Sequence, residues 1–167
     1  MLLVYRSSQF FDTVRPFTPC CDLTYILSWK LRMGAGNEEL ARVLVMVQDT
    51  GCRHVGMLPH VHRDFERLDE RWRKKLERHF RNYGIEGTSM PPEQFKSEGR
   101  HPTGGVRTRD IQLWAFKAFQ TRLYGTVVGI RGVQTFAGLE LITDKKQQTA
   151  DQELLKRVAK DFAQYQD

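Results

Sequence analysis

Basic and phenolic side chains near the C-terminus are the residues best suited to do chemistry. Arg122 and Tyr124 stand two positions apart, and the basic pair Lys145-Lys146 follows an apolar run at 133–142. Arginine can hold two phosphate oxygens at once, so basic groups without matched acids suit a phosphate ligand. The alternative for Lys145-Lys146 is a solvated strand end before a helix. The nearby acids are only Asp110, Glu140 and Asp144.

Three consecutive apolar runs are expected to position this cluster. They cover Ile111–Phe119, Thr121–Ile130 and Val133–Ile142, and Gly132 can turn the chain between the last two. The first run is apolar on both faces, which predicts a central strand. Short strands joined by tight turns favour an antiparallel meander.

Strand periodicity decides which side chains meet. A period of two puts Arg122 and Tyr124 on one face of the second strand. In the third run the alternation predicts that Val133, Ala137 and Leu141 share a face. If the strands pair in order, Lys117 at the end of the first strand converges with them on one side of the sheet.

The remaining elements are predicted mainly as helices. Asn37 offers an N-cap for a helix ending near Asp49–Gly51, and Cys52–Leu58 fits a short strand closed by Pro59. Apolar residues at steps of three and four predict a helix over His60–Tyr83 with a charged face that pairs with itself.

Further signals mark the ends of these helices. Gly84 is expected in the left-handed position after the long helix, with Ile85 packing back on Phe80. Residues 86–105 are rich in Gly, Pro and Ser and are expected to form a loop. Thr149, with Gln152 three residues on, predicts the start of a capped C-terminal helix.

Composition limits the class of protein. The chain has 167 residues, a net charge of +6 and a pI near 9.4, which favour a polyanionic partner. Three cysteines in a chain this long argue against a disulfide framework and for a reducing compartment. With His54, His60 and His62, these cysteines match no standard zinc spacing. No signal peptide or membrane-length apolar run is present, so a cytoplasmic protein is expected.

These signals predict an α+β fold. A small antiparallel sheet of three or more strands should pack against helices, with a helical extension at the N-terminus. Residues 1–50 are expected to form that extension, and residues 51–167 the domain that carries the basic cluster.

The order of the C-terminal motifs resembles a known family. It reads F-K … L-W-x-F-K … T-R-L-Y … L-I-T-D-K-K-Q-Q-T … E-L-L-K-R-V-A-K, which is similar to the RelE/HigB toxins of bacterial toxin–antitoxin systems, within the RelE/ParE superfamily. Phe95-Lys96 matches the loop element of these toxins and Leu113–Lys117 the first strand signature. Arg122–Tyr124 matches the arginine strand and Lys145–Thr149 the basic end. The resemblance covers about Val55 to Asp167.

The resemblance implies an endoribonuclease that cleaves messenger RNA on the ribosome, without a cofactor or metal, and that a cognate antitoxin neutralises. In this reaction the RNA 2′-hydroxyl attacks its own 3′-phosphate, which requires positioned cations and a proton-transfer group. Arg122 and Lys146 would then hold the phosphate, with Tyr124 or Lys145 for proton transfer. The expected RNA contacts are Lys96, Arg107, Arg109, Lys117, Arg131 and Gln147.

Two alternatives stay open at this stage. A non-catalytic member of the same fold would bind nucleic acid only, or a protein target, as the related ParE toxins act on DNA gyrase. An unrelated phage or mobile-element interaction protein would use its basic faces only to dock a partner. No histidine follows His101, so proton transfer at the cluster would depend on tyrosine or lysine.

Overall fold

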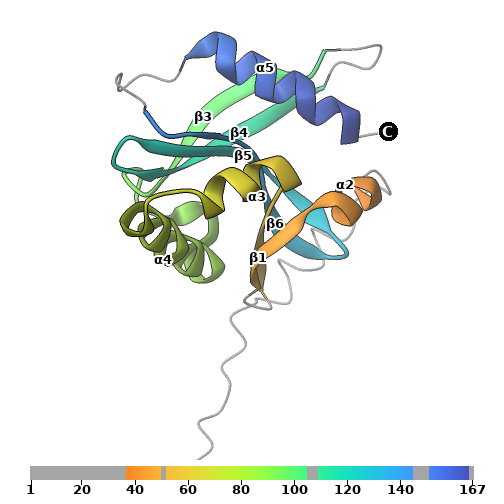
Figure 1. Ribbon diagram of the computed structural model, residues 1–167. Coiled ribbons are helices and arrows are strands. Elements are labelled where there is room, and N and C mark those ends of the chain that lie inside the picture. The colour runs from red at the N-terminus through yellow and green to blue at the C-terminus, as the bar shows by residue number, and fades with distance from the viewer. Residues whose placement is uncertain (1–36, 50–51, 105–108, 145–150, 166–167) are drawn as a thin grey trace, which may run out of the picture.

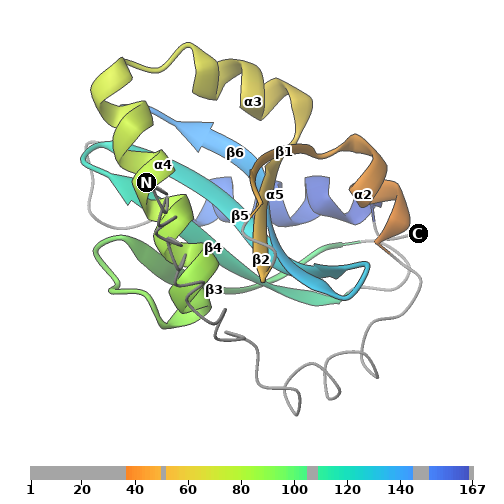
Figure 2. The same ribbon diagram turned by 90° about the horizontal axis from the view of Figure 1, so that it is seen from below.

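The computed structural model describes residues 37–49, 52–104, 109–144 and 151–165 of the chain. Figure 1 shows α5 lying across one side of a twisted sheet, with α4 on the other side. Figure 2, from below, shows α4 in front of the sheet and α5 behind it. The helices are α2 (Glu38–Val43), α3 (Pro59–Glu66), α4 (Glu70–Glu86) and α5 (Gln152–Phe162), with short 3₁₀ turns at Gly87–Ser89 and Ala163–Tyr165.

Six strands form one sheet in the order β1-β2-β6-β5-β4-β3. The last four strands along the chain form an antiparallel meander; the three predicted strands, β4 to β6, are confirmed, and β3 extends the meander by one strand that was not predicted. β2 lies parallel to β6, while α3 and α4 connect β2 to β3 at the far edge of the sheet. The expected α+β class is confirmed, with one parallel pair in an otherwise antiparallel sheet. The strands are β1 (Val45–Asp49), β2 (Arg53–Met57), β3 (Phe95–Pro102), β4 (Asp110–Ala118), β5 (Thr121–Ile130) and β6 (Val133–Ile142).

The helix predicted from Asn37 to Asp49–Gly51 is wrong in its second half. It ends at Val43, and residues 45–49 form β1, which pairs with β2. β-branched Val45 and Val47 fit a strand better than a helix. Asn37 does not cap the helix through its side chain; its Nδ2 donates to the carbonyl of Gly129 at 3.1 Å, which ties α2 to β5.

The long helix predicted over His60–Tyr83 is two helices. The first helix ends at Glu66 and the second begins at Glu70. Asp69 caps the second helix, because its carboxylate accepts a hydrogen bond from the Arg71 N–H at 2.9 Å. Gly84 lies inside α4 rather than after it. The left-handed residue is Gly87, at φ 62°, and Ile85 is 70% exposed instead of packing on Phe80.

Two further boundaries differ from those predicted. The expected loop at 86–105 contains β3, an edge strand whose exposed, mostly polar residues give no alternating pattern. In α5 the cap is Asp151, which accepts from the N–H groups of Glu153 and Leu154, whereas Thr149 lies outside the described residues. The apolar face predicted for this helix is confirmed by the burial of Leu155, Val158 and Phe162.

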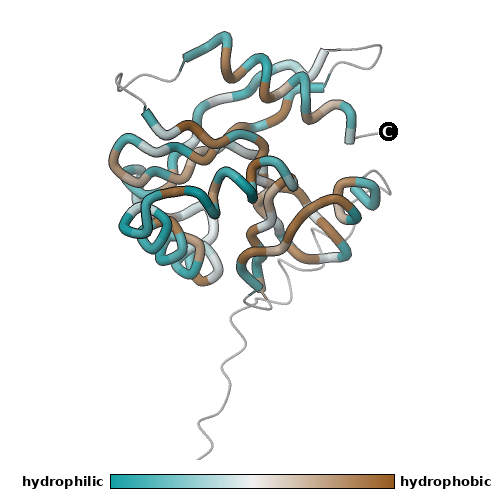
Figure 3. The backbone as a smooth tube through the Cα atoms, viewed as in Figure 1, coloured by the Kyte–Doolittle hydropathy of each residue, from teal (hydrophilic) through white to brown (hydrophobic). Residues whose placement is uncertain are grey.

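Aromatic rings fill the layer between α4 and the sheet. Tyr83 contacts the rings of Phe95, Phe116 and Phe136 with centroids 5.3–6.3 Å apart, mostly edge to face. In Figure 3 the apolar stretches run along the central strands, while α4 is largely hydrophilic outside its buried stripe. Burial of this face therefore fixes α4 on the sheet. Among the described residues, no helix is both long and apolar enough to cross a membrane.

A bulge resets the register of the β5–β6 hairpin. Gly125 pairs with Gly138, but Tyr124 pairs with Glu140, so Leu139 is the extra residue on β6. The alternation predicted for this strand breaks there, because Ala137 and Leu141 end on opposite faces of the sheet. The bulge puts Arg122 opposite Ile142 instead of Leu141. It therefore decides which residues at the end of β6 share a face of the sheet with Arg122.

Candidate functional site

Strand register gathers four chemically useful side chains on one face of the sheet. Lys117 of β4 pairs with Arg122 of β5, and Ala115 pairs with both Tyr124 of β5 and Lys96 of β3. Cross-strand partners share a face, and residues two apart share it too. Lys96, Lys117, Arg122 and Tyr124 therefore lie together, as the sequence predicted for Lys117, Arg122 and Tyr124.

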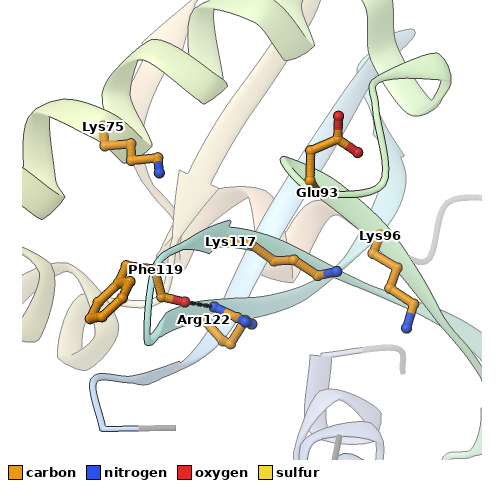
Figure 4. Close-up of a pocket in the computed structure, with 6 residues that line it drawn as sticks. All are labelled: Lys75, Glu93, Lys96, Lys117, Phe119 and Arg122. Atoms are coloured by element: carbon orange, nitrogen blue, oxygen red, sulfur yellow. Dashed lines mark hydrogen bonds between the residues drawn. The ribbon is translucent and has the colours of Figure 1, made fainter. Parts of the chain in front are cut away.

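A pocket of about 430 Å³ opens where β4 ends and β5 begins. Figure 4 shows Lys117 and Arg122 at its centre, with Lys75 approaching from α4 and Lys96 from β3. The lining combines four cationic side chains with one carboxylate, and this excess of positive charge attracts anions. The pocket is lined by Lys75, Glu93, Lys96, Lys117, Phe119 and Arg122.

Lys117 is held from two sides by the segment before β3. Its Nζ donates to the carbonyl of Pro92 at 2.8 Å, and its backbone N–H donates to the carbonyl of Gln94 at 2.9 Å. Gln94 is fixed in turn by α4, because its Oε1 accepts from His79 Nδ1 at 3.0 Å and Asn82 Nδ2 at 3.2 Å. The ammonium group is therefore positioned before any ligand binds.

The charge of Lys117 is destabilised where it stands. Partial burial lowers the pKa of Lys117 below its usual range, and the positive charge of Lys96 lowers it further. Glu98 acts in the opposite direction more weakly. An anionic ligand would relieve both costs, because it replaces lost solvation and offsets the repulsion from Lys96.

Arg122 is anchored by the turn that it follows. Its Nη1 donates to the carbonyl of Phe119 and, at 2.9 Å, to that of Thr121. Within the described part of the chain, Lys96, Lys117 and Arg122 form no ion pair. The charge of Lys117 is offset at a distance by Glu98 and Glu93.

Tyr124 lies on the same face but is buried. Burial raises the pKa of its hydroxyl to about 12, and the charge of Glu98 adds to this effect. At neutral pH the phenol therefore keeps its proton and can only donate it. Glu140, the residue opposite Tyr124, accepts from Arg157 of α5 at 3.3 Å, so this acid is shared with α5.

Two other predicted residues, Arg109 and Arg131, do not join this pocket. Arg109 precedes β4 and Arg131 lies in the β5–β6 turn, so both stand at the opposite end of the sheet. At roughly 3.3 Å per residue, Arg122 and Ile130 are already about 26 Å apart along β5. Arg107, Lys145, Lys146 and Gln147 lie outside the described residues.

Three lining residues were not predicted from the sequence, and one of them, Glu93, fell in the expected loop at 86–105. Lys75 was assigned to a solvated helix face, and only the packing of α4 against the sheet brings it here. Phe119 was taken as the last residue of a strand, whereas it occupies the turn after β4 at φ 57°. The available signal was an aromatic residue at the junction of two strand runs, two residues after Lys117 and three before Arg122.

The arrangement can hold a phosphate from several directions. Among the described residues, no group of three or more His, Cys, Asp or Glu side chains is arranged to hold a metal ion. Comparisons of the chain with protein-family models, with curated proteins and with solved structures find no match.

Proposed function

We propose that this protein is a RelE/HigB-like toxin, an endoribonuclease that cleaves messenger RNA on the ribosome. The pairing of Lys117 with Arg122 beside a cationic pocket is the observation that carries the proposal. It adds a geometric argument to the motif resemblance, because the arginine of the T-R-L-Y motif and the lysine of L-W-x-F-K face the same space. The proposal places the protein in the cytoplasm, where ribosomes are.

The reaction needs charge stabilisation more than covalent chemistry. The RNA 2′-oxygen forms a bond to the adjacent phosphorus while the bond from phosphorus to the 5′-oxygen breaks, which leaves a 2′,3′-cyclic phosphate and a 5′-hydroxyl. Negative charge grows on the phosphate oxygens, and Arg122 with Lys117 and Lys96 would stabilise it. One proton must leave the 2′-hydroxyl and one must reach the 5′-oxygen.

Proton transfer has fewer candidates than charge stabilisation. The lowered pKa of Lys117 makes its neutral, proton-accepting form more accessible than that of an ordinary lysine. The pKa of about 12 suits Tyr124 only to donation. The resemblance adds Lys145 as a candidate for proton transfer and Lys146 for holding the phosphate.

Substitution of Arg122 by Ala tests the proposal. Inducible expression in bacteria followed by transcript-end mapping should show messenger cleavage in the wild type. Arg122→Ala should reduce the cleavage rate about 100-fold or more, as loss of one positioned charge-stabilising group does. Arg67→Ala is the matched control, since Arg67 is an exposed arginine that pairs with Asp64 at 3.8 Å outside the pocket, and it should leave cleavage within about twofold.

Cleavage by Arg122→Ala at the wild-type rate would refute this assignment. Growth arrest with DNA damage and intact messengers would instead favour a gyrase-directed member of the fold. A second candidate, binding of nucleic acid without cleavage, is favoured by the burial of Tyr124 and the direction of its pKa shift. Binding of RNA by the purified protein with no cleavage on ribosomes would support that candidate.

A further inference from the structure

Phe119 occupies a turn position where the backbone conformation is strained for an aromatic residue. It is the first of the two residues between β4 and β5, and its φ of 57° lies in the left-handed region. Such turn positions favour Gly, Asn or Asp, and a bulky side chain there is strained. It is also 63% exposed, so burial in the core does not compensate for the strain. Strain at a pocket rim points to a role in binding.

A second ring on α4 holds Phe119 in place. The rings of Trp72 and Phe119 stack with centroids 5.1 Å apart and planes only 12° from parallel. The guanidinium of Arg71 lies 4.8 Å from the Trp72 ring centroid. With one face of Phe119 covered by Trp72, the exposed surface includes the opposite face. The pair therefore presents a fixed, flat aromatic surface.

The same residue adjoins the cationic pocket. The carbonyl of Phe119 accepts from Arg122 Nη1, and both side chains line the pocket with Lys117. Figure 4 shows the Phe119 ring on one side of Arg122, with the amines of Lys117 and Lys96 on the other. An aromatic surface beside a phosphate-sized cluster of cations matches a nucleotide, in which a flat base is joined to a phosphate.

We infer that Phe119 stacks on an unpaired base of a single-stranded nucleic acid whose adjacent phosphate lies against Arg122 and Lys117. A base must be outside a duplex to offer its face to a protein ring, which excludes fully paired RNA as the ligand. Stacking tolerates any base, so the surface contributes affinity and position without reading sequence. This inference deepens the proposed function and rests on it for the identity of the nucleic acid as RNA.

Binding of a non-cleavable ligand isolates the stacking step. The full chain is titrated by fluorescence anisotropy with a short labelled 2′-O-methyl RNA, which cannot react, and with an abasic strand of equal length and charge. The wild type should bind the base-containing strand about tenfold more tightly, which corresponds to one stacked base. Phe119→Leu, which removes the ring but stays apolar, should abolish this preference.

Two variants control for loss of fold or of apolar surface. Phe119→Tyr retains a ring and should keep the preference within about twofold of the wild type, since stacking depends on the ring face. Ile85→Ala removes a comparably exposed apolar side chain ten residues beyond Lys75 on α4 and should leave the preference unchanged. Circular dichroism of each variant verifies that it is folded.

The outcomes separate the inference from the proposed function. Equal affinity of the wild type for the two strands, a preference that survives in Phe119→Leu, or no binding of either strand overturns the inference, whatever the cleavage assay shows. A preference for the base-containing strand that depends on the Phe119 ring supports the inference. If messengers on ribosomes are intact in the same experiments, the proposed cleavage is refuted while the inference stands.

Discussion

The two turns that bound β5 solve the same problem with different residues. At the β5–β6 turn, Arg131 and Gly132 both have positive φ, of 49° and 83°, which suits a tight hairpin whose twist matches the strands. At the β4–β5 turn, Phe119 alone has a positive φ, and no glycine accompanies it. Both turns therefore have a bulky side chain at positive φ, but only the first has a glycine beside it to complete the tight turn. The second has an aromatic ring there, beside the pocket, so this residue is better explained by binding than by folding.

The charges at the two ends differ in the same way. Arg131 pairs with Glu38 at 3.6 Å, and both side chains are more than half exposed, so the pair contributes little to stability. At the other end, Lys117 is half-buried near Lys96 and Arg122, an arrangement that weakens its own charge. One end is thus a solvated surface, and the other keeps like charges together at a cost.

The bulge at Leu139 separates these two ends, and Gly125 opposite it should be the most sensitive position. A Cβ at residue 125 would lie 2.1 Å from the Ala137 carbonyl oxygen and 2.5 Å from the Phe136 ring. Since backbone cannot yield easily, Gly125→Ala should lower the free energy of unfolding by about 3 kcal/mol or more. Urea denaturation followed by circular dichroism measures this change.

The same substitution should also disturb the pocket. Arg122 depends on the register beyond the bulge, so RNA binding should weaken in Gly125→Ala even where the protein is still folded. A loss of stability below about 1 kcal/mol would show that the strands part easily here, and the bulge would then not fix the register of Arg122.

Substitutions in the two turns should change the stability by an intermediate amount and so test the difference between the turns. No atom lies within 4 Å of a Cβ built at Gly132, so Gly132→Ala should cost about 1–2 kcal/mol through backbone strain alone. Gly132→Asn should recover most of that loss because asparagine tolerates the left-handed region. Thermal unfolding of the variants provides the comparison.

Phe119→Asn completes this comparison at the other turn. Relief of strain should offset the lost stacking on Trp72, so its free energy of unfolding should change by less than about 0.5 kcal/mol. A destabilisation larger than that of Gly132→Ala would mean that Phe119 serves the fold, and the contrast between the two turns would fail.

The β5–β6 hairpin was predicted from sequence patterns better than the rest of the fold was. β5 and β6 were predicted to the residue because alternating apolar runs flank Arg131-Gly132, a strong local turn signal. The predicted meander also brought Lys117 and Arg122 to one side of the sheet, and their pairing in the structure confirms this. Local sequence patterns are therefore sufficient to predict the meander of β4, β5 and β6.

The remainder depends on contacts between distant segments. β3 has mostly exposed polar residues and pairs as an edge strand, so no periodicity marks it, and the parallel pairing of β2 with β6 has no local signal at all. Lys75 reaches the pocket only because α4 packs on the aromatic rings of the sheet. The break at Asp69 was not predicted, because the helical spacing of apolar residues continues across it.

The smallest expected effect concerns the pH dependence of the pocket. Lys117 binds an anion while it is protonated, and its pKa lies below the ordinary lysine value of 10.5 because of burial and the charge of Lys96. As pH rises through this lowered pKa, Lys117 loses its charge first, and affinity for the 2′-O-methyl RNA should fall about fivefold, close to 1 kcal/mol for one partly screened charge. Anisotropy titrations across alkaline pH at constant ionic strength would show this step.

Two variants distinguish Lys117 from the other lysines as the source of the step. Lys117→Arg keeps its charge throughout, so the step should disappear below pH 10.5. Lys96→Gln removes the second cause of the shift, so the step should move to higher pH although the pocket has lost a charge. Lys74→Gln, a lysine paired with Glu70 at 2.6 Å outside the pocket, should leave the profile unchanged. If all four proteins gave superimposable profiles, Lys117 would be an ordinary surface lysine, and the pocket would be no more than a second solvated end of the sheet.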